Sequence, residues 1–289
     1  MHCIAIIITY KIGKDIYKYF NSVVSQVDAV LIIDNGSSDE TLICLKEIEK
    51  NEKVKVIFNN ENMGIAAALN QGVEYAIGEK YDWVLCLDHD SECNPDMVRT
   101  LFEHYRNISF KNKVAILAPN IIDKNTGELY CKEHGIKELD MMQTSGSLIK
   151  TEVFKYVGFF NDSLFLYYVD DDFCLRLRKK GYRIIGCCSA LLYHRTGMTQ
   201  KKFFMGKQFY VNNYNYIARY YLTRNAIYIV KNYFPLFRRY TYSIVRRFFE
   251  DFLKIVLFEK DKFKKIRYIF NGLIDGIANN YGKLSKIND

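Results

Sequence analysis

Proline is scarce in this 289-residue sequence, and no low-complexity or repeated segment is present. These absences exclude a repeat array and a disordered, proline-rich chain. Hydrophobic residues instead make up 49% of the sequence and aromatic residues 15%, which is typical of a globular protein. The length allows a full core in one large domain, or in one domain with an appendage.

Several motifs that identify other protein classes are missing as well. The glycine-rich dinucleotide-binding fingerprint does not follow the first predicted strand, and no phosphate-loop lysine motif occurs. A Rossmann dehydrogenase and a phosphate-loop enzyme are therefore disfavoured. Lysine and arginine interrupt every apolar stretch before it reaches the roughly 18 residues of a membrane-spanning helix. No nucleic-acid-binding motif occurs, so we expect no nucleic-acid partner.

The eight cysteines are scattered without the paired spacing of a metal site. Nothing like a signal peptide precedes the first predicted strand. We therefore expect reduced thiols in a cytoplasmic protein.

Positive charge is concentrated in the last third of the chain. Residues 201–289 contain 18 Lys and Arg against 6 Asp and Glu, a net charge of +12, whereas residues 1–200 carry −4. This shift predicts a boundary near Gly197–Lys202. We expect one domain over residues 1–200 and a basic, aromatic-rich helical region over residues 201–289.

Residues 1–200 alternate between predicted strands and helices. Short apolar runs predict buried strands, and apolar residues at helical spacing predict the helices between them. Repeated units of this length predict a mostly parallel sheet with helices on both faces. The predicted strands are Cys3–Thr9, Ala29–Asp34, Val54–Phe58, Trp83–Leu87, Val114–Ala118 and Arg183–Cys188, and the predicted helices are Asp15–Gln26, Ser38 or Asp39 to Lys50, Ile65–Ile77, one that opens at Pro95, and Phe173–Lys180.

Polar clusters follow the first four of these strands, where each strand ends. Because open α/β sheets bind ligands at the carboxyl ends of their strands, four clusters on one edge predict a binding site. The aspartates of the last cluster would suit Mg²⁺ or Mn²⁺ bound to a substrate phosphate. The second cluster is also typical of a turn with a helix cap. In chain order the clusters are Thr9-Tyr10-Lys11, Asp34–Asp39, Asn59–Gly64 and Asp88-His89-Asp90.

These clusters, together with a later acidic run, resemble the motifs of one enzyme family. The sequence is similar to family 2 inverting glycosyltransferases of GT-A fold, and within that family it most resembles the bacterial rhamnosyltransferases. The family motifs are matched by Thr9-Tyr10, Asp34-Asn35-Gly36-Ser37, Asn62-x-Gly64, Asp88-His89-Asp90 and Tyr168–Arg176. The rhamnosyltransferase motifs are matched by residues 87–91, residues 144–149, Asp275-Gly276 and Gly282-Lys283.

The resemblance covers essentially the whole chain. It implies the GT-A fold, which is the α/β fold of nucleotide-diphospho-sugar transferases, with a mostly parallel sheet and helices on both faces. The basic C-terminal helical region would be an addition to this fold. Residues 1–200 would then be the catalytic domain. The chain departs from the family pattern at Lys11, where Asn is common, at His89, where Gln is more usual, and at Asp172, where Glu is frequent.

The resemblance also implies how a nucleotide sugar and a cation would be bound. Asp90 would hold Mn²⁺ or Mg²⁺, with Asp88 near the ribose or reaching the metal through water. His194 would reach the metal or the diphosphate, although a lone histidine is more often structural. Asp34 would hydrogen-bond to a pyrimidine and Tyr10 would pack against it, although Tyr10 also suits a strand-end core position. The residues expected at the nucleotide sugar are Thr9, Tyr10, Asp34, Asn62, Gly64 and Asp88.

The acidic run Asp170-Asp171-Asp172 would supply the catalytic base. Alignment with the family places the base at Asp170, which would take the proton of an acceptor hydroxyl. Three adjacent carboxylates repel one another, which should raise the pKa of at least one. The alternative is an acidic first turn stabilised by the dipole of the following helix, with Arg176 as a structural ion-pair partner. The catalytic and the structural interpretation are compatible if Asp171 or Asp172 caps the helix while Asp170 faces the cleft.

Ser145 and Gly146 are expected on the acceptor side, because glycine allows a sugar ring to lie against the backbone. A simple strand bend is the alternative.

The basic C-terminal region has apolar residues at helical spacing with Lys and Arg between them. Helices of this kind can lie on an anionic membrane surface. Alternatively they pack on the catalytic domain or on a second subunit, which would give a homo-oligomer. The predicted helices are Tyr216–Tyr221, Ile227–Tyr233, Tyr240–Leu257 and Phe263–Ile277.

Residues and resemblance together predict a metal-dependent inverting glycosyltransferase of the hexosyltransferase class. It would transfer L-rhamnose from dTDP-L-rhamnose to a lipid-linked glycan acceptor in bacterial surface polysaccharide synthesis, O-antigen or capsule, at the cytoplasmic face of the plasma membrane. The alternatives are a UDP- or GDP-linked donor and a non-catalytic sugar-nucleotide-binding subunit. A nucleotidyltransferase is disfavoured, because a glycine- and arginine-rich loop does not follow the first strand.

Overall fold

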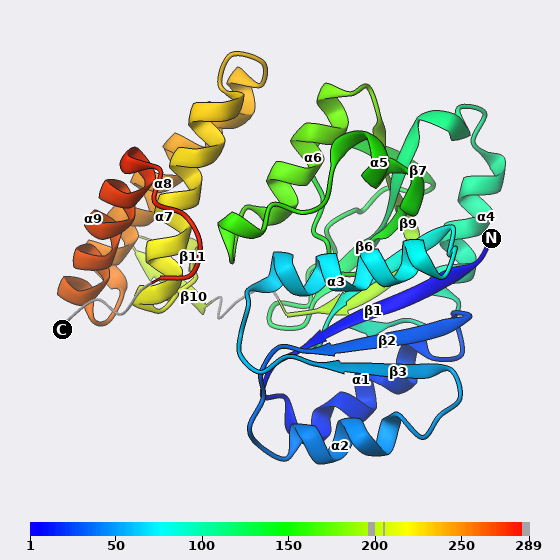
Figure 1. Cartoon of the computed structure of the whole chain (residues 1–289). Coiled ribbons are helices and arrows are strands. Elements are labelled where there is room, and N and C mark those ends of the chain that lie inside the picture. Colours follow the sequence, from blue (N-terminus) through cyan, green and yellow to red (C-terminus); the bar gives the residue numbers. More distant parts are fainter. Residues whose placement is uncertain (196–199, 205, 285–289) are drawn as a thin grey trace. The chain divides into compact units, whose positions relative to one another are not determined.

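The computed structural model of the protein describes residues 1–195, 200–204 and 206–284 (Figure 1). The chain divides into two compact units. The first unit comprises Met1–Asn161 and Phe173–Arg195, and the second comprises Asp162–Asp172 and Thr196–Asp289. Residues 197–199 of the boundary predicted near Gly197–Lys202 lie outside the described residues, and the division at residue 200 stays a prediction. The charge pattern gives no indication that residues 162–172 group with the second unit.

Four neighbouring strands of the first unit run parallel. They lie in the order β3 (Val54–Phe58), β2 (Ala29–Asp34), β1 (Cys3–Thr9) and β4 (Trp83–Asp88). Every residue of β1 is buried, as expected for an apolar strand that is covered on both faces. These four predicted strands are confirmed, and β4 is one residue longer than its apolar run.

The remaining strands make the sheet mixed. β6 (Val114–Asp123) and β9 (Arg183–His194) are parallel to each other, while β8 (Leu148–Lys150) lies antiparallel between β4 and β6. β5 (Glu92–Cys93) and β7 (Ile136–Leu139) pair antiparallel with β9. β6 and β9 continue past their predicted ends. β5, β7 and β8 are not predicted, because strands this short have no recognisable pattern of apolar residues in the sequence.

Helices cover both faces of this sheet, as predicted (Figure 1). α1 (Ile16–Val23), α2 (Thr41–Ile48) and α4 (Met97–Asn107) share one core with the odd-numbered side chains of β1. α3 (Ile65–Gly78) packs on the opposite face, where its Gly72 lies against Ile6. The short helices of the first unit are η1 (Gly13–Asp15), η2 (Lys111–Lys113), η3 (Thr151–Val153) and α5 (Phe154–Val157), and η4 (Asp162–Leu164) belongs to the second unit.

The helix α6 (Val169–Lys179) begins earlier than the predicted start at Phe173. Its first turn therefore contains the three aspartates, which are favourable at the positive end of a helix dipole. The division between the two units falls inside α6, between Asp172 and Phe173. Arg176 donates to the carbonyls of Gly158 and Phe159, at 3.3 and 2.8 Å, in the first unit.

In its described part, the second unit has a hairpin and three long helices. The hairpin pairs β10 (Gln200–Phe204) with β11 (Lys207–Val211). α7 (Tyr216–Tyr233) is one helix where two shorter helices are predicted, and it packs along α9 (Lys262–Ala278). α8 (Arg238–Phe258) joins the two in sequence. Among the described helices, none is both long enough and apolar enough to cross a membrane.

Buried charges connect these three helices. Arg219 of α7 donates to Glu259 at 2.6 Å and to Asp251 at 2.9 Å, and Lys265 of α9 donates to Glu259 at 2.8 Å. Arg219, Glu259 and Lys265 are all buried. Because a buried charge without its partner is strongly destabilising, these pairs tie the packing of the three helices to one another.

One pair of cysteines differs from the expectation of reduced thiols. Cys131 and Cys188 form a disulfide with their Cα atoms 5.7 Å apart, which is an ordinary separation for such a bond. Their separation of 57 residues gives no local spacing that would reveal the pair in the sequence. The other six cysteines are free and buried, so the expectation is wrong for this pair alone.

Candidate active site

The carboxyl ends of β1, β2 and β4 meet at one edge of the sheet, which we call the carboxyl edge. In the parallel register Thr9 lies opposite Asp34, and Ile8 lies opposite Asp88. The loops that follow these strands therefore begin side by side. This is the arrangement that the polar clusters predict.

Asp34 is buried at the carboxyl edge, where three donors surround its carboxylate. Its Oδ1 accepts from the hydroxyls of Thr9 at 3.1 Å and Ser37 at 2.6 Å, and its Oδ2 accepts from the Ser37 amide at 2.8 Å. These bonds form the turn that is the alternative interpretation of this motif. They also fix the carboxylate in place, while a contact between Asp34 and a pyrimidine stays a prediction.

Asn35 joins the loop after β2 to the loop after β3. Its side-chain nitrogen donates to the Asn62 side chain and to the Gly64 carbonyl, both at 3.2 Å, and its oxygen accepts from the Met63 amide at 3.0 Å. The Gly64 amide donates to Asn62 at 2.9 Å, where α3 begins. The structure thus brings Asn62 and Gly64 beside the Asp34 loop. Asn35 is not among the predicted site residues, and its place in the Asp34–Ser37 motif is the signal that could have identified it.

Tyr10 and His89 are neighbours at this edge. The Tyr10 amide donates to Nδ1 of His89 at 3.3 Å, which leaves the ring proton on Nε2. Burial lowers the pKa of His89, so its neutral form is favoured. The Tyr10 side chain is 38% exposed, so it is not the core aromatic of the alternative interpretation, and a planar ligand could reach its ring.

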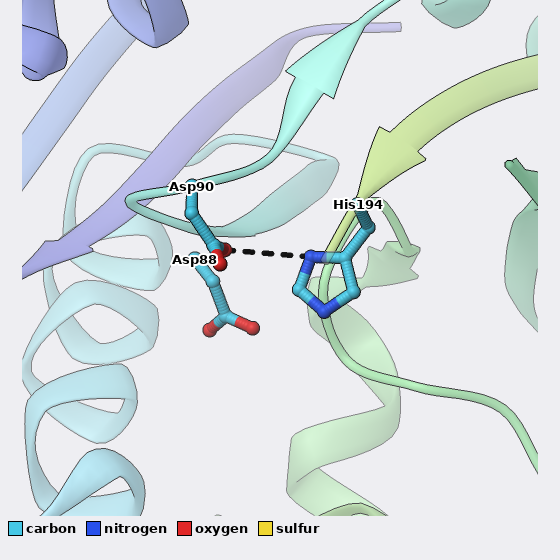
Figure 2. A group of neighbouring side chains, drawn as sticks. All are labelled: Asp88, Asp90 and His194. Carbon is cyan, nitrogen blue, oxygen red and sulfur yellow. Dashed lines mark ion pairs between the residues drawn. The ribbon is translucent and has the colours of Figure 1, made fainter. Parts of the chain in front are cut away.

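Asp88, Asp90 and His194 form a group that could hold a metal ion (Figure 2). Each offers one ligand atom, and these atoms lie within 4.8 Å of one another. The Asp90 carboxylate faces the His194 ring, with Oδ1 3.5 Å from Nδ1, and Asp88 lies beside them. Pairing of Glu92 in β5 with Tyr193 in β9 places His194, at the end of β9, next to the turn that carries Asp90.

Two buried serines orient this group. The Ser91 hydroxyl lies 2.8 Å from Nδ1 of His194 and 2.6 Å from the Ser145 hydroxyl, and Ser145 accepts from the Asp88 amide at 3.0 Å. Both serines are buried. The sequence does not predict Ser91 as a site residue. It predicts Ser145 on the acceptor side, whereas the contacts of Ser145 in the structure are to the turn that carries the candidate metal ligands.

Gly146 is required by packing inside the first unit. Its φ is +84°, and a Cβ at this position would lie 2.6 Å from Leu192 and 2.7 Å from Pro119. Its amide donates to the Cys86 carbonyl at 2.7 Å. These features fit the strand-bend alternative, and a contact between Gly146 and an acceptor sugar stays a prediction.

Three charged residues beside the candidate metal ligands are absent from the sequence prediction. Lys124 donates to the Asp90 carbonyl at 3.0 Å and lies 3.4 Å from Glu92, which is 2.7 Å from Lys18. Burial lowers the pKa of Lys124. The two lysines fix the turn and supply positive charge close to where an anionic ligand would bind. They come from segments far apart in the chain, so no local motif identifies them.

The donor atoms of the candidate metal site fit a divalent cation that binds phosphate. Carboxylates suit Mg²⁺ and Mn²⁺, and an imidazole is acceptable to Mn²⁺. Three protein ligands would leave coordination positions for diphosphate oxygens or water. Within the part of the chain that the structure describes, this is the one such group of three or more ligating side chains.

The acidic turn, residues 170–172, lies in the second unit, where tyrosines of α7 and α8 bind it. Asp172 is fully buried, and its Oδ1 accepts from the hydroxyls of Tyr233 at 2.6 Å and Tyr228 at 3.3 Å. Asp171 accepts from the hydroxyl of Tyr240. These contacts favour a structural part for Asp171 and Asp172. The expectation that one of them caps the helix stays a prediction.

The raised pKa expected in the acidic run occurs at Asp171. Burial, followed by the charge of Asp170, raises the pKa of Asp171 to about 7, and Arg247 opposes this shift. Asp170 itself is half-buried. Its assignment as the catalytic base stays a prediction.

Residues 4–164 match the family model described as glycosyl transferase family 2. The match covers more than half of the chain and includes the carboxyl edge. The protein therefore belongs to glycosyltransferase family 2.

Two curated relatives match nearly the whole chain. The low-salt glycan biosynthesis hexosyltransferase Agl10 of Haloferax volcanii is 27% identical, over 96% of this chain and 92% of that protein. The dTDP-rhamnosyl transferase RfbF of Shigella flexneri is 26% identical, over 94% of each chain. The chain is thus similar from end to end to enzymes named as sugar transferases.

Solved glycosyltransferase structures share the fold. TarS of S. aureus, residues 1–349 in complex with UDP-GlcNAc, has a TM-score of 0.63 at 16% identity, over 96% of this chain and 82% of that chain. GalNAc-T7 with UDP, GalNAc and Mn²⁺ also has a TM-score of 0.63, at 14% identity, over 96% of this chain and 56% of that chain. The predicted GT-A fold is confirmed.

Proposed function

We propose that the protein is a metal-dependent, inverting glycosyltransferase that uses a nucleotide diphosphate sugar. The observation that carries this proposal is the group formed by Asp88, Asp90 and His194 at the carboxyl edge. Its two aspartates lie at the end of β4, which is paired with β1, and β1 is paired in turn with β2, so Tyr10 and Asp34 come from the ends of the two neighbouring strands. A cation-binding group next to an accessible aromatic ring fits a ligand with a diphosphate and a planar base.

In the proposed reaction an acceptor hydroxyl attacks the anomeric carbon from the face opposite the diphosphate. The new C–O bond forms as the bond to the diphosphate breaks, the hydroxyl proton passes to the Asp170 carboxylate, and the nucleoside diphosphate leaves. A cation bound by Asp88, Asp90 and His194 would neutralise the negative charge that develops on the leaving group.

The remaining predicted site residues would bind the nucleotide. Tyr10 would stack on the pyrimidine, and Asp34 would accept a hydrogen bond from it. Thr9 would hold the Asp34 carboxylate, through the hydroxyl contact of 3.1 Å, and Asn62 and Gly64 would lie on the other side of the nucleotide. Ser145 and Gly146 would lie towards the acceptor.

For the substrates we propose dTDP-L-rhamnose as the donor and a lipid-linked bacterial glycan as the acceptor. The similarity over 94% of the chain to a protein named dTDP-rhamnosyl transferase supports this donor. The other relative is named a hexosyltransferase of glycan biosynthesis, which supports the broader class of reaction. The product would be part of a surface polysaccharide such as O-antigen or capsule.

A donor panel with stereochemical analysis tests this proposal. Thermal shift with Mn²⁺ and dTDP-, UDP- or GDP-linked sugars should show stabilisation by dTDP-L-rhamnose, and NMR of the product should show an inverted anomeric centre. Stabilisation by UDP or GDP sugars alone would show that the donor is not dTDP-L-rhamnose, while the assignment as a glycosyltransferase would stand. A retained configuration would exclude inversion, and binding without transfer to any acceptor would favour the non-catalytic subunit.

We propose that the C-terminal region, residues 201–289, binds the anionic cytoplasmic surface of the membrane. α8 exposes an apolar stripe at three- and four-residue spacing, and α9 exposes a second stripe in which Phe263 is 91% exposed. The net charge of +12 over this region favours an anionic surface and disfavours a second copy of the same positively charged region. The stripes are Tyr242, Val245, Phe249, Leu253 and Val256 on α8, and Phe263, Phe270, Ile274 and Ile277 on α9.

Co-sedimentation with vesicles tests this surface. The wild type should bind vesicles of anionic lipid, bind neutral vesicles weakly, and be released by salt, because charge attraction contributes about 1 kcal/mol per basic residue near the surface. The double variant Phe249→Ser/Phe263→Ser should bind less, whereas Ile43→Ser, at an exposed apolar residue of α2, should not differ from wild type. If the protein binds neither anionic nor neutral vesicles and forms dimers in solution, the apolar stripes join two copies of the chain instead.

A further inference from the structure

Three bulky residues just before the acidic turn have left-handed backbone conformations. Phe165, Tyr167 and Tyr168 have φ values of 62°, 63° and 60°. Side chains of this size are rarely found in this region, and such conformations persist only where the surrounding structure enforces them. They also gather at functional sites. We call residues 163–168 the left-handed segment.

Asn225 of α7 binds the left-handed segment from inside the second unit. It is fully buried, and its side-chain nitrogen donates to the carbonyls of Leu164 at 2.9 Å, Leu166 at 2.8 Å and Tyr167 at 3.0 Å. Its side-chain oxygen accepts from Nε of Arg224 at 2.9 Å. A carboxylate of the same shape would meet three carbonyl oxygens with no hydrogen to share, so the amide is required at this position.

Arg224 completes the contact. It is 1% exposed, and its guanidinium donates to the Leu164 carbonyl at 2.9 Å and to the Gly282 carbonyl at 2.7 Å. The Gly282 amide donates in turn to the Ser163 carbonyl at 2.6 Å. The guanidinium also lies 4.9 Å from the centre of the Tyr221 ring. The chain after α9 and the start of the left-handed segment are thus joined through one buried arginine.

Close packing of α9 on α7 makes this arrangement possible. A Cβ at Gly272 would lie 2.6 Å from the Tyr220 carbonyl oxygen, and one at Gly276 would lie 3.0 Å from that of Arg224. Asp275, between them in sequence, accepts from the Tyr220 hydroxyl at 2.6 Å. The proposed donor site does not use the motifs Asp275-Gly276 and Gly282-Lys283. In the structure these motifs lie where α9 and the chain after it pack on α7, the helix that binds the left-handed segment.

The same helix therefore fixes the backbone on both sides of Asp170. Upstream, Asn225 holds the segment that ends at Tyr168, and downstream Tyr233 holds Asp172. We propose that Arg224 and Asn225 are positioning residues, which set the location of the Asp170 carboxylate by holding the left-handed segment. This inference rests on the proposed function, because it concerns the base of that reaction. It would make the C-terminal helices part of the catalytic apparatus in addition to their proposed membrane binding.

Substitutions at Asn225 separate positioning from packing. Asn225→Asp keeps the shape and removes the donors, Asn225→Ala removes both, and Arg224→Lys is a milder change that keeps the charge and loses the fork of donors. Asn232→Ala is the matched control, because Asn232 is exposed on the same helix and its side chain donates within that helix, to the Tyr228 carbonyl at 2.8 Å. Each variant is made in the full chain.

Three measurements give the expected pattern. Turnover with acceptor should fall by about 10²-fold in Asn225→Asp and Asn225→Ala, because a small displacement of a reacting group has effects of this size. The affinity for nucleotide with Mn²⁺ should not change, because the predicted nucleotide residues all lie in the first unit. Amide hydrogen exchange should increase in residues 163–172. Asn232→Ala should match wild type in all three, and Arg224→Lys should show a smaller change of the same kind.

Opposite results are equally clear. Wild-type turnover in Asn225→Asp would overturn the positioning role, and so would a loss of turnover that is matched by equal losses of nucleotide affinity and global stability. If Asp170→Asn has wild-type turnover, or if the wild-type protein transfers no sugar, the proposed function fails and the catalytic part of this inference fails with it. The exchange measurement would still decide whether the pair holds the left-handed segment.

Discussion

The carboxylates of the two units are held in place by different kinds of partner. At the carboxyl edge of the first unit, Asp34 accepts from Ser37, three residues along the chain, and from Thr9 on the adjacent strand. In the acidic turn of the second unit, Asp172 accepts from Tyr228 and Tyr233, which are 56 and 61 residues away. A short motif contains the first set of contacts, and only the folded helices create the second.

This difference corresponds to two parts of the proposed reaction. The first unit would bind the nucleotide and the cation, and the second would supply the base and its supports. Variants at the carboxyl edge should therefore weaken nucleotide binding, whereas variants in the acidic turn should change turnover or stability and leave nucleotide binding intact. Four experiments test this difference.

The largest effect is expected at the carboxyl edge. Asp90→Ala removes one of three candidate cation ligands, so turnover should fall by about 10³-fold or more, because the leaving diphosphate loses charge stabilisation. Cation-dependent nucleotide binding, measured by calorimetry with and without EDTA, should be lost as well. Asp140→Ala, at an exposed aspartate of the first unit, is the control. Wild-type turnover of Asp90→Ala in EDTA would disprove the metal assignment.

A separate effect on turnover is expected in the acidic turn. Asp170→Asn should lower turnover by about 10²–10⁴-fold, because the acceptor proton loses its base, and nucleotide affinity should not change. Asp172→Asn keeps an oxygen that can accept from Tyr233, so its turnover should stay near wild type. Steady-state kinetics and nucleotide binding measure both quantities. The reverse result would place the base at Asp172.

A smaller effect, on stability, is expected at Asp171. Its pKa of about 7 lies above the ordinary 3.8, so between these values the folded state binds more protons than the unfolded chain. This group therefore makes the free energy of unfolding fall as pH rises towards 7 and has no further effect above it. Asp171→Asn, which keeps an oxygen for Tyr240, should raise that free energy by about 2 kcal/mol at pH 8 and leave it unchanged near pH 4.

Urea unfolding at the two pH values measures this difference. Asp162→Asn, at an exposed aspartate of the same unit, is the control and should show no pH-dependent change. An equal change of Asp171→Asn at both pH values would show that the carboxylate of Asp171 is not destabilised by its surroundings.

The smallest effect is expected at Tyr10. Tyr10→Ala should weaken nucleotide binding by about 10-fold, which is the lower range for stacking of a base on an aromatic ring, and turnover at saturating donor should not change. Tyr156→Ala, at a tyrosine with 61% of its surface exposed, is the control. A loss of turnover without a loss of affinity would show that Tyr10 does not contact the base.

Much of the fold and of the carboxyl edge can be predicted because their signals are local. β1 to β4 are apolar runs that end in polar clusters, and parallel pairing necessarily brings those ends together. The placement of Asp88 and Asp90 follows from the strand that precedes them. The position of His194 needs the resemblance to the family, because a single histidine at the end of a strand has no pattern of its own.

The rest depends on contacts between distant segments. β8 has three residues and is recognised only by its partners β4 and β6. Lys124 and Asn225 are single polar residues within longer patterns, and nothing near them in the sequence shows that one binds the Asp90 turn and the other binds three carbonyls. The start of α6 is predicted too late, because three adjacent aspartates suggest a loop as readily as a first turn.

The grouping of residues 162–172 with the C-terminal helices limits how this protein can be dissected. A fragment that ends at residue 200, where the net charge changes sign, would contain the acidic turn and lack Tyr233 and Asn225. Such a fragment could keep the sheet while its acidic turn loses the side chains that hold it. Likewise, a C-terminal region transplanted from a relative would have to present the same side chains to this turn. The change in charge marks a border in composition, and it does not mark an interchangeable module.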